Sequence, residues 1–230
     1  MKILYVIPAR GGSKGIPYKN IKPLNGKPLI YYTIDVARQL TNDDNICVTT
    51  DDDKIIEVVK KYGLEVPFKR PEYLATDSAT TNDVLLHAID YYENNSKNYD
   101  VLVLLQPTSP LKKAVQVREA LKIYNDQLDM VVSVKESHAA SVICSENENG
   151  FLELCLNKES SRRQDLSSFY EYNGAIYIIN IKSLKEKGLS GFNRKKKYVM
   201  DELSSIDIDI PLDLIIVESI LKQENSNFNV

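Results

Sequence analysis

The 230-residue sequence is poor in the residues from which metal and disulfide sites are usually built. It has two histidines, His87 and His138, and three cysteines, Cys47, Cys144 and Cys155, none of which forms a C-x-x-C pair. Structural zinc sites need clustered cysteines and histidines, so a zinc site is not expected. We predict that the cysteines are reduced thiols that pack as small side chains.

Long hydrophobic runs and an excess of positive charge are also absent. No stretch approaches the roughly 20 apolar residues of a membrane span, and the first residues lack a signal-peptide cleavage pattern. Lys and Arg number 29 against 32 Asp and Glu, whereas nucleic-acid readers usually carry a basic excess. The one basic run, Arg194–Lys197, is expected to be a solvated loop. We therefore expect a cytoplasmic protein with neither nucleic acid nor membrane as a partner.

What is present is an alternation of strand and helix patterns, with 43% hydrophobic residues, enough for a real core. Because such alternation produces a doubly wound α/β sheet, we predict that fold class and a single domain over residues 1–230. Ligands on such sheets bind beyond the carboxyl ends of the strands. Strands are expected at 2–7, 45–50, 101–106, 130–134 and 174–179, and helices after Pro28, from Asp51–Asp53 to Tyr62, over 113–124 and from Pro211 to Glu224.

The strand–helix rhythm breaks between about residues 136 and 172. This segment is polar, rich in Ser, Glu and Asn, and irregular in its pattern. On the pattern alone it is either a flexible surface loop or an arm that packs on a partner subunit.

The loop PARGGSKGIPYKN, residues 8–20, combines glycines, cations and neutral hydrogen-bonding side chains. Glycines let backbone N–H groups approach a ligand, and cations add charge-assisted donors, which together suit a polyphosphate. Because the loop directly follows a buried strand, we interpret it as a phosphate site rather than a solvated turn. The residues concerned are Gly11, Gly12, Gly15, Arg10, Lys14, Lys19, Ser13 and Asn20.

Two similar motifs do not fit this loop. It contains no G-x-x-x-x-G-K-[S/T], so it is not a Walker-type loop. Gly11–Gly15 does read G-x-S-x-G, the nucleophile elbow of esterases, but that elbow needs a helix directly after the serine. Pro17 and Pro23 oppose such a helix, which disfavours a hydrolase.

A second polar site is predicted in IDIDIPLD, residues 206–213. Strict alternation puts Asp207 and Asp209 on one face of an extended segment. Adjacent carboxylates repel unless a cation is near, and Mg²⁺ is commonly held by one or two carboxylates plus substrate phosphates. The pattern alone leaves a solvated strand edge as an equal alternative. Asp213 is expected to cap the last helix.

Five motifs, in this order and spacing, resemble the acylneuraminate cytidylyltransferase family, the CMP-sialic acid synthetases. The resemblance covers nearly the whole chain and implies a Rossmann-like, mostly parallel sheet and a homodimer. It also implies that residues 136–172 form an inserted dimerisation arm. The motifs are PARGGSKGIPYKN, LLQPTSPL (104–111), RQDL (163–166), NGAIYI (173–178) and SIDID (205–209).

The resemblance also implies a role for each matching residue. The CTP phosphates are expected at the first loop, and Mg²⁺ or another divalent cation at Asp207 and Asp209. The cytosine and ribose are expected near Arg70, Ala79 and Thr81. The acidic sugar is expected near Gln106, Arg163, Asn173 and Tyr177.

The implied reaction is attack of the sugar's anomeric hydroxyl on the α-phosphorus of CTP. Arg10 and Lys14 would stabilise the phosphate charge, and Asp209 is the candidate proton acceptor. Two positions depart from the family pattern on the sugar side: Ser141 stands where a lysine is usual, and Phe192 is all that is left of an aromatic pair. Neuraminic, legionaminic and pseudaminic acids therefore stay open as substrates. The alternatives are a Kdo-specific enzyme and a non-catalytic nucleotide-binding scaffold.

Overall fold

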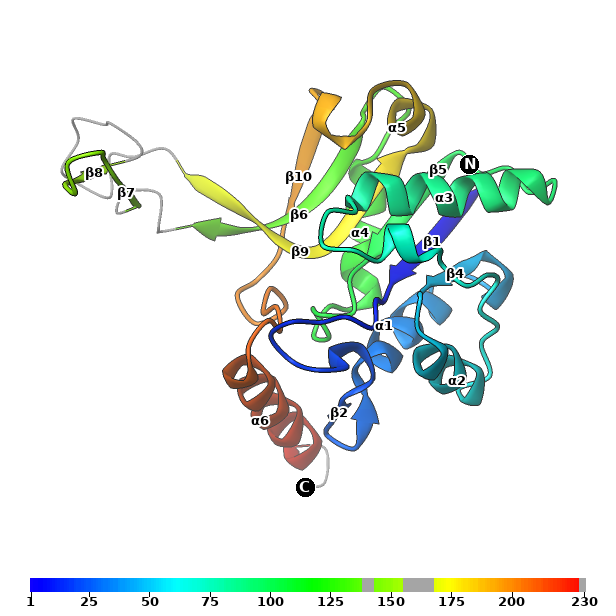
Figure 1. The fold of residues 1–230 in the computed structure, drawn as a ribbon, viewed down its shortest axis with the longest axis horizontal. Helices are drawn as coiled ribbons and strands as arrows, with labels where there is room; N and C mark the ends of the chain where they lie inside the picture. The colour runs from blue at the N-terminus through cyan, green and yellow to red at the C-terminus, as the bar shows by residue number, and fades with distance from the viewer. Residues whose placement is uncertain (138–142, 155–167, 228–230) are drawn as a thin grey trace.

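The computed structural model describes residues 1–137, 143–154 and 168–227. Its centre is a six-stranded sheet with the strand order β10-β6-β9-β5-β1-β4 (Figure 1). Every neighbouring pair is parallel except those of β9, which runs antiparallel to β5 and β6. The predicted mostly parallel α/β sheet is therefore confirmed. The strands are β1 (Ile3–Pro8), β4 (Ile46–Thr49), β5 (Val101–Leu105), β6 (Met130–Ser137), β9 (Phe169–Asn180) and β10 (Lys195–Val199).

Helices cover both faces of this sheet, because side chains alternate along each buried strand. In β1, Tyr5 and Ile7 pack under α1 (Leu29–Arg38), α2 (Asp53–Lys61) and α4 (Ala114–Ile123). Leu4 and Val6 point the other way, toward α3 (Thr81–Asn94) and α5 (Ile181–Lys187). The strands are buried on both sides, which explains their continuous apolar sequences.

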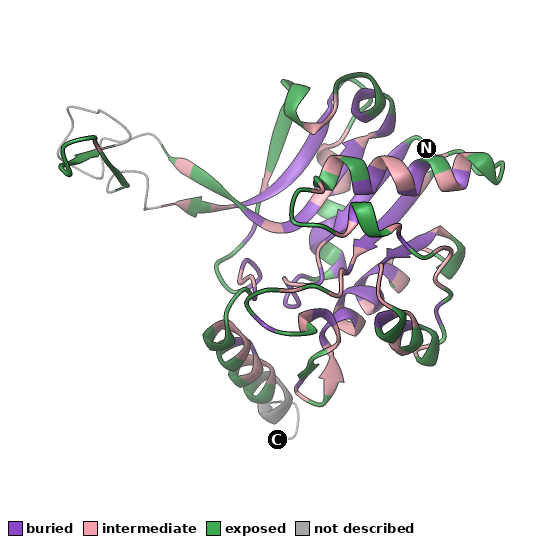
Figure 2. Ribbon diagram, in the orientation of Figure 1, coloured by how far each residue is buried: buried purple, intermediate pink, exposed green. Residues whose placement is uncertain are grey.

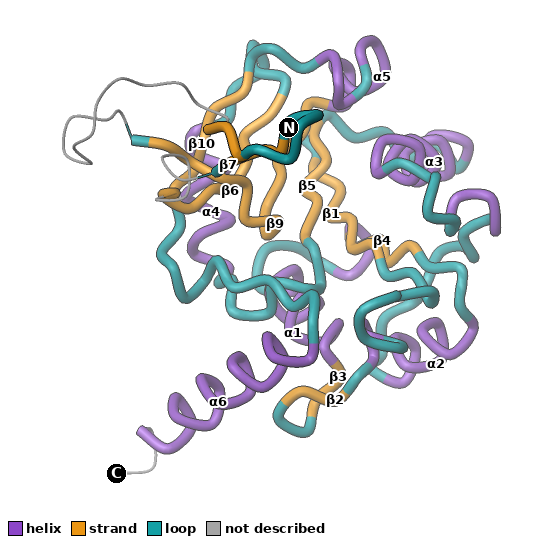
Figure 3. The backbone as a smooth tube through the Cα atoms, turned by 60° about the vertical axis from the view of Figure 1, so that its left-hand side comes forward, coloured by secondary structure: helices purple, strands orange, loops and turns teal. Residues whose placement is uncertain are grey.

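A third, smaller hydrophobic cluster joins the two ends of the chain. It packs the first loop and the short hairpin of β2 (Pro23–Leu24) and β3 (Lys27–Pro28) against the segment before α6 (Pro211–Asn227). Figure 3 shows this region below the carboxyl ends of β1, β5 and β4. Burial of these side chains from water holds two segments together that are about two hundred residues apart in sequence. The buried members are Ile16, Leu24, Leu29, Leu111, Ile208 and Val217.

The starts of two predicted helices, α2 and α6, are explained by aspartates that accept backbone hydrogen bonds. Asp52 is the N-cap of α2, and its Oδ1 accepts hydrogen bonds from the backbone N–H groups of Lys54 (2.8 Å) and Ile55 (3.1 Å). Asp213, in the first turn of α6, accepts hydrogen bonds from the N–H groups of Asp209 and Ile210, both at 2.9 Å. The capping role expected for Asp213 is thus confirmed, and the same carboxylate holds the backbone of Asp209.

The prediction of a solvated loop at Arg194–Lys197 is wrong. Residues 195–199 form β10, which pairs in parallel with β6 at the edge of the sheet. The lysine side chains are exposed, and lysines on an edge strand oppose pairing with other chains. The charged residues 195–197 therefore belong to a strand, although a run of charges is typical of a solvated loop. Among the described residues, no helix is both long enough and apolar enough to cross a bilayer.

The segment that seemed irregular contains strands wherever it is described. β6 and β9 continue as a paired ribbon through Ser137 and Phe169. Beyond them lies a hairpin of β7 (Cys144–Glu146) and β8 (Leu152–Leu154). Figure 1 shows that this ribbon projects away from the body of the sheet, and Figure 2 shows that much of its length is exposed.

Candidate active site

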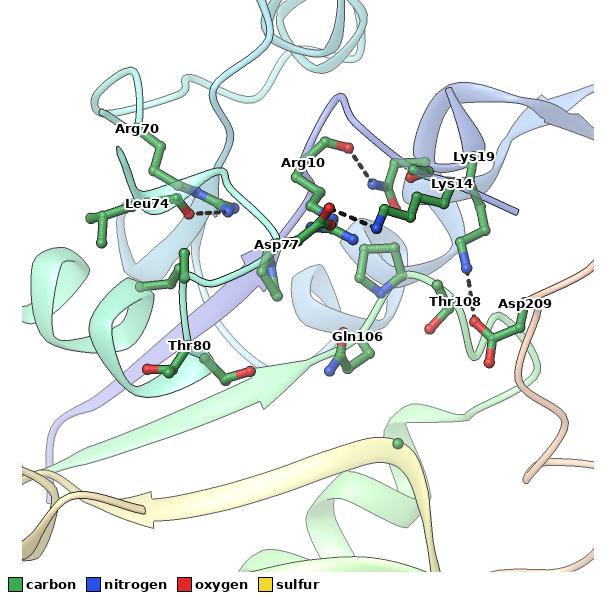
Figure 4. A pocket seen from close by; sticks show the side chains of 18 of the residues that line it. Arg10, Lys14, Lys19, Arg70, Leu74, Asp77, Thr80, Gln106, Thr108 and Asp209 are labelled. Carbon is green, nitrogen blue, oxygen red and sulfur yellow. Dashed lines mark hydrogen bonds and ion pairs between the residues drawn. The ribbon is translucent and has the colours of Figure 1, made fainter. Parts of the chain in front are cut away.

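A cavity of about 580 Å³ lies at the carboxyl ends of β1, β4 and β5. Its walls come from five separate parts of the chain: the first loop, residues 70–85, residues 106–108, Gly174 of β9 and the paired acids near residue 208 (Figure 4). This is the position that the doubly wound topology predicts for a ligand site.

Most of the residues that the sequence pointed to line this one cavity. The first loop and the paired acids, almost two hundred residues apart, meet across it. Their individual roles stay predictions, but their juxtaposition is what a shared ligand requires. The residues are Arg10, Ser13, Lys14, Gly15, Lys19, Asn20, Arg70, Ala79, Thr81, Gln106, Asp207 and Asp209.

Four other candidates lie outside the lining, and a fifth, Arg163, lies outside the described residues together with Ser141. Gly11 donates its N–H to Asp51 Oδ1 (3.1 Å), and a Cβ there would lie 2.6 Å from Asp52 Oδ2, so this glycine is needed for packing. Gly12 has open space around it. Their predicted contacts with CTP stay predictions.

Asn173 and Tyr177 belong to β9, behind the cavity wall. The Asn173 amide is buried, donates to Ser205 Oγ (2.9 Å) and accepts from Ser133 Oγ (2.6 Å). Its hydrogen bonds therefore hold the segment before the acids onto the sheet. Burial raises the pKa of Tyr177, as does, to a smaller extent, the charge of Asp207. Their predicted sugar contacts are not tested by this geometry.

Two cations of the first loop converge on one carboxylate that the sequence did not identify. Arg10 Nη1 lies 3.1 Å from Asp77 Oδ1, and Lys14 Nζ lies 2.7 Å from Asp77 Oδ2. The hydrogen bond from Lys14, followed by that from Arg10, lowers the pKa of Asp77. Asp77 thus marks a point where two charged donors meet on oxygen atoms, the arrangement that a phosphate group also needs.

The third cation, Lys19, contacts the acidic segment directly. Its Nζ donates to the backbone oxygen of Ile208 (2.7 Å) and to Asp209 Oδ1 (3.0 Å). Gly15 makes this contact possible, because a Cβ at that position would lie 2.4 Å from the backbone oxygen of Asp209. The first loop and the acidic segment therefore touch backbone to backbone.

The other carboxylate, Asp207, is tied to the loop that follows β5. Its Oδ1 accepts a hydrogen bond from Ser109 Oγ (3.0 Å), and the next backbone N–H, that of Ile208, donates to Thr108 O (2.8 Å). Gly174, with φ 74°, lines the cavity opposite, and a Cβ there would lie 3.8 Å from Asp207 Oδ2. Both Thr108 and Ser109 belong to the LLQPTSPL motif, yet Gln106 is the one residue of that motif predicted to contact the sugar.

Arg70 forms the inner wall of the cavity and is almost completely buried. Its guanidinium donates to the hydroxyl (3.1 Å) and the backbone oxygen of Thr49 and to Leu74 O (3.4 Å). Burial lowers its pKa, while the charge of Asp51 opposes that shift. Arg70 therefore joins the end of β4 to the turn at residues 72–74 and shapes the space where the base is expected.

The paired acids can hold a divalent cation only with help from a ligand. Asp207 and Asp209 line the same cavity, but the described residues contain no group of three or more His, Cys, Asp or Glu side chains placed to hold a metal. Magnesium commonly takes one or two carboxylates and completes its shell with substrate phosphates and water. The two carboxylates beside the cation-rich first loop fit that requirement.

Comparisons with known proteins agree with this geometry. The chain is 38% identical over 221 residues to an N-acylneuraminate cytidylyltransferase of Streptococcus agalactiae serotype V; the match covers 94% of this chain and 52% of the relative. The chain thus spans about half the length of that relative. It is 34% identical to the CMP-N,N'-diacetyllegionaminic acid synthase of Legionella pneumophila (96% and 97% covered) and 34% identical to the pseudaminic acid cytidylyltransferase of Campylobacter jejuni (93% and 94% covered).

Solved structures show the same fold. A CMP:2-keto-3-deoxy-manno-octonic acid synthetase complexed with CTP matches with a TM-score of 0.73 at 20% identity, covering 97% of this chain and 100% of that one. A 4-diphosphocytidyl-2C-methyl-D-erythritol synthase of Anaerococcus prevotii matches with a TM-score of 0.65 at 12% identity, covering 96% and 98%. At these identities the likeness concerns the fold alone.

The family assignment rests on nearly the whole chain. The family described as Cytidylyltransferase matches residues 4–227. The three relatives described above are named for N-acylneuraminate, diacetyllegionaminic acid and pseudaminic acid, which favours a nonulosonic acid enzyme over the Kdo alternative. The chain belongs to the cytidylyltransferase family, as its motifs predicted.

Proposed function

We propose that this chain transfers the cytidylyl group of CTP to the anomeric hydroxyl of an acidic nine-carbon sugar and releases pyrophosphate. One observation carries the proposal: a cation-rich loop and a pair of carboxylates face each other across one cavity. The new bond joins the sugar oxygen to the α-phosphorus, and the bond from that phosphorus to the pyrophosphate oxygen breaks. No covalent enzyme intermediate is needed, so the residues act by positioning and charge neutralisation.

Arg10, Lys14 and Lys19 are proposed to bind the triphosphate. In the free protein Arg10 and Lys14 share Asp77, and Lys19 is paired with Asp209. Phosphate oxygens offer the same hydrogen-bond geometry with more negative charge, so the cations can exchange one partner for another. Arg10 and Lys14 would then stabilise the charge that builds up on the phosphates as the bond breaks.

Asp207 and Asp209 are proposed to hold Mg²⁺ or another divalent cation together with the phosphates. Such an ion, when bound, would neutralise phosphate charge and lower the pKa of the attacking hydroxyl. Asp209 is the more exposed of the pair, and we propose it as the group that takes the proton from the sugar.

The sugar is proposed to occupy the end of the cavity near Gln106, Thr108 and Gly174. The named relatives act on neuraminic, diacetyllegionaminic and pseudaminic acids at similar identities to this chain. Identity therefore does not single out one sugar. Phe192, a position considered for sugar contact, is 4% exposed and packs in the hydrophobic core under α3 and α5.

A homodimer is proposed as the working assembly, with the projecting ribbon as its arm. The β7–β8 hairpin exposes Phe151 and Leu152 by 68% and 74%, and large apolar side chains on a protruding element are typical of a surface that a partner covers. Light scattering of the purified chain tests this. We expect twice the chain mass of 26.1 kDa, and a mass of one chain at micromolar concentration would contradict it.

A substrate panel tests the activity. Purified protein is incubated with CTP, Mg²⁺ and, in turn, neuraminic, legionaminic and pseudaminic acid derivatives and Kdo, and pyrophosphate is measured. We expect release with at least one nonulosonic acid, and none when CTP is replaced by ATP or the sugar is omitted. Binding of CTP without turnover of any acid would show a scaffold, and turnover of Kdo alone would show the other enzyme class.

A further inference from the structure

A lysine that the sequence did not identify lies beneath the floor of the cavity. Lys112, 2% exposed, follows the loop after β5 and precedes α4. Its Nζ donates to three oxygen atoms: Gln106 O (2.6 Å), Ser109 O (2.8 Å) and Thr33 Oγ1 (2.8 Å). The loop at residues 106–109 is thus wrapped around one ammonium group and anchored to α1.

All three partners of this ammonium are neutral. Among the described residues, no carboxylate lies within ion-pair distance of Lys112 Nζ. Burial lowers the pKa of Lys112 to about 7, and the negative charge of Asp207 opposes that shift. Burying an ammonium without a charged partner is costly for folding. A side chain that only filled this space could be apolar, so the presence of an amine points to a role for its three hydrogen bonds.

The loop around Lys112 leads directly to the paired acids. Ser109, whose backbone oxygen binds Lys112, donates its hydroxyl to Asp207 Oδ1 (3.0 Å). Gln106, whose backbone oxygen also binds Lys112, presents its side chain to the cavity. The same four-residue loop therefore connects one buried amine with a predicted metal ligand and a predicted sugar contact.

We propose that Lys112 is a positioning residue: it fixes loop 106–109 so that Ser109 holds the Asp207 carboxylate toward the bound nucleotide. This inference rests on the proposed function, since it assumes that Asp207 helps to bind a metal–nucleotide complex. Lys112 itself does not line the cavity and touches no reacting atom.

A double-mutant cycle tests whether Lys112 acts through Ser109. Lys112→Met, Ser109→Ala and the double variant are compared in kcat and in Mn²⁺ binding to the CTP complex, measured by electron paramagnetic resonance. Groups that orient a metal ligand typically contribute about 10–100-fold in affinity or activity. We expect each single variant to lose about that much in both readouts. The double variant should lose no more than Lys112→Met alone, because the two residues act in series.

Lys113→Met is the matched control, since Lys113 is the neighbouring lysine, is exposed and does not line the cavity. We expect it to stay within twofold of the parent in kcat. If Lys112→Met does not fold, Lys112→Gln replaces it in the cycle, because the amide keeps N–H donors without the charge.

Three outcomes would overturn the proposal: unchanged Mn²⁺ binding in Lys112→Met, losses that multiply in the double variant, or a loss explained by the unfolded fraction. The Mn²⁺-binding arm of the cycle is independent of the sugar. If the parent chain released pyrophosphate with no acid, the proposed function would fail, while the Mn²⁺–CTP titration would still decide the role of Lys112.

Discussion

The carboxyl edge of the central sheet, where its parallel strands end at the cavity, and the opposite amino edge, where they begin, each bury a charged side chain in a different way. At the edge opposite the cavity, Asp129 precedes β6 and is completely buried. It accepts hydrogen bonds from Lys187 Nζ (2.8 Å), Ser183 Oγ (2.8 Å) and two backbone N–H groups, those of Asn193 and Arg194. At the cavity edge, the partners of Lys112 within the described part of the chain are three neutral oxygen atoms.

This contrast separates charges that stabilise the fold from charges that we propose to bind a ligand. The hydrogen bond from Lys187, followed by backbone and hydroxyl donors, holds the pKa of Asp129 far below its usual value. None of these partners lines the cavity. At the cavity edge, Arg10 and Lys14 form ion pairs with Asp77, and Lys19 forms one with Asp209. We propose that a ligand can open each of these pairs. At the amino edge the buried charge is paired within the fold. At the carboxyl edge we propose that the cations can exchange their carboxylate partners for a ligand.

The largest effect is expected when a charge at the cavity edge is removed. Arg10→Ala and Asp209→Ala should each lower turnover by about 10²–10³-fold, the usual cost of one lost transition-state contact. Both should remain folded, because Arg10 and Asp209 form ion pairs only at the rim of the cavity. Pyrophosphate release and circular dichroism measure the two properties. Near-normal turnover in either variant would refute its role, and Asp53→Ala, at the exposed start of α2, is the control.

A second prediction concerns the close approach of the two chain segments. Gly15→Ala should lower turnover by roughly 100-fold, because the added methyl meets the backbone oxygen of Asp209 at 2.4 Å and must move the acids, and displacements of about 1 Å cost that much. Gly12→Ala adds the same methyl where no atom lies within 4 Å, so its loss should be clearly smaller. Equal losses would show that loop flexibility, and not this contact, decides the rate.

The opposite edge should respond in stability and not in rate. Asp129→Asn should lower the free energy of unfolding at pH 7 by about 3 kcal/mol, as expected for a buried ion pair that loses one partner, with turnover per folded molecule unchanged. Urea unfolding measures this, and Asp126→Asn, an exposed neighbour, should change stability by less than about 0.5 kcal/mol.

The same variant carries a pH signature. The pKa of Asp129 is lower in the folded protein than in the unfolded chain, where it is about 3.9. Its contribution is therefore present above about pH 4 and is lost as the pH falls below that value. The stability difference between parent and variant should narrow between pH 5 and pH 3, to be checked by the same unfolding curves; a constant difference would contradict the assignment.

The smallest effect is expected at Asp77, which competes with phosphate for the loop cations. Asp77→Asn should tighten CTP binding by at most about fivefold, since exposed ion pairs of this kind are weak. Calorimetric titration with CTP measures the change, and the gain should shrink in high salt. Weaker CTP binding in the variant would mean that Asp77 organises the first loop instead of occupying the position of a phosphate group.

The sequence predicted the elements whose pattern is local. Buried strands such as β5 read as continuous apolar runs, and Asp52 and Asp213 signalled helix starts by their position. The helix α3 was overlooked, although Thr80 and Asp83 form a capping box at its start. A threonine followed three residues later by an aspartate is a local pattern that predicts a helix start from the sequence alone.

Other features depend on partners that no local pattern reveals. The insertion of β9 as an antiparallel strand between β6 and β5 follows from tertiary packing alone. Asp77 and Lys112 look in sequence like solvated charges at a turn and at a helix start. Their contacts arise only in the folded chain, which brings Arg10 to Asp77 and places loop 106–109 around Lys112.

The contact between Lys19 and Asp209 joins residues 190 positions apart, and this spacing has a consequence for biosynthesis. At the usual 5–20 residues per second, a ribosome needs roughly 10–40 s to pass from one to the other. During that interval the nascent chain carries the first loop without the acidic segment that it contacts in the folded protein. The proposed nucleotide contacts both segments, so its binding can stabilise the chain only after both have been synthesised and cannot guide the first steps of folding.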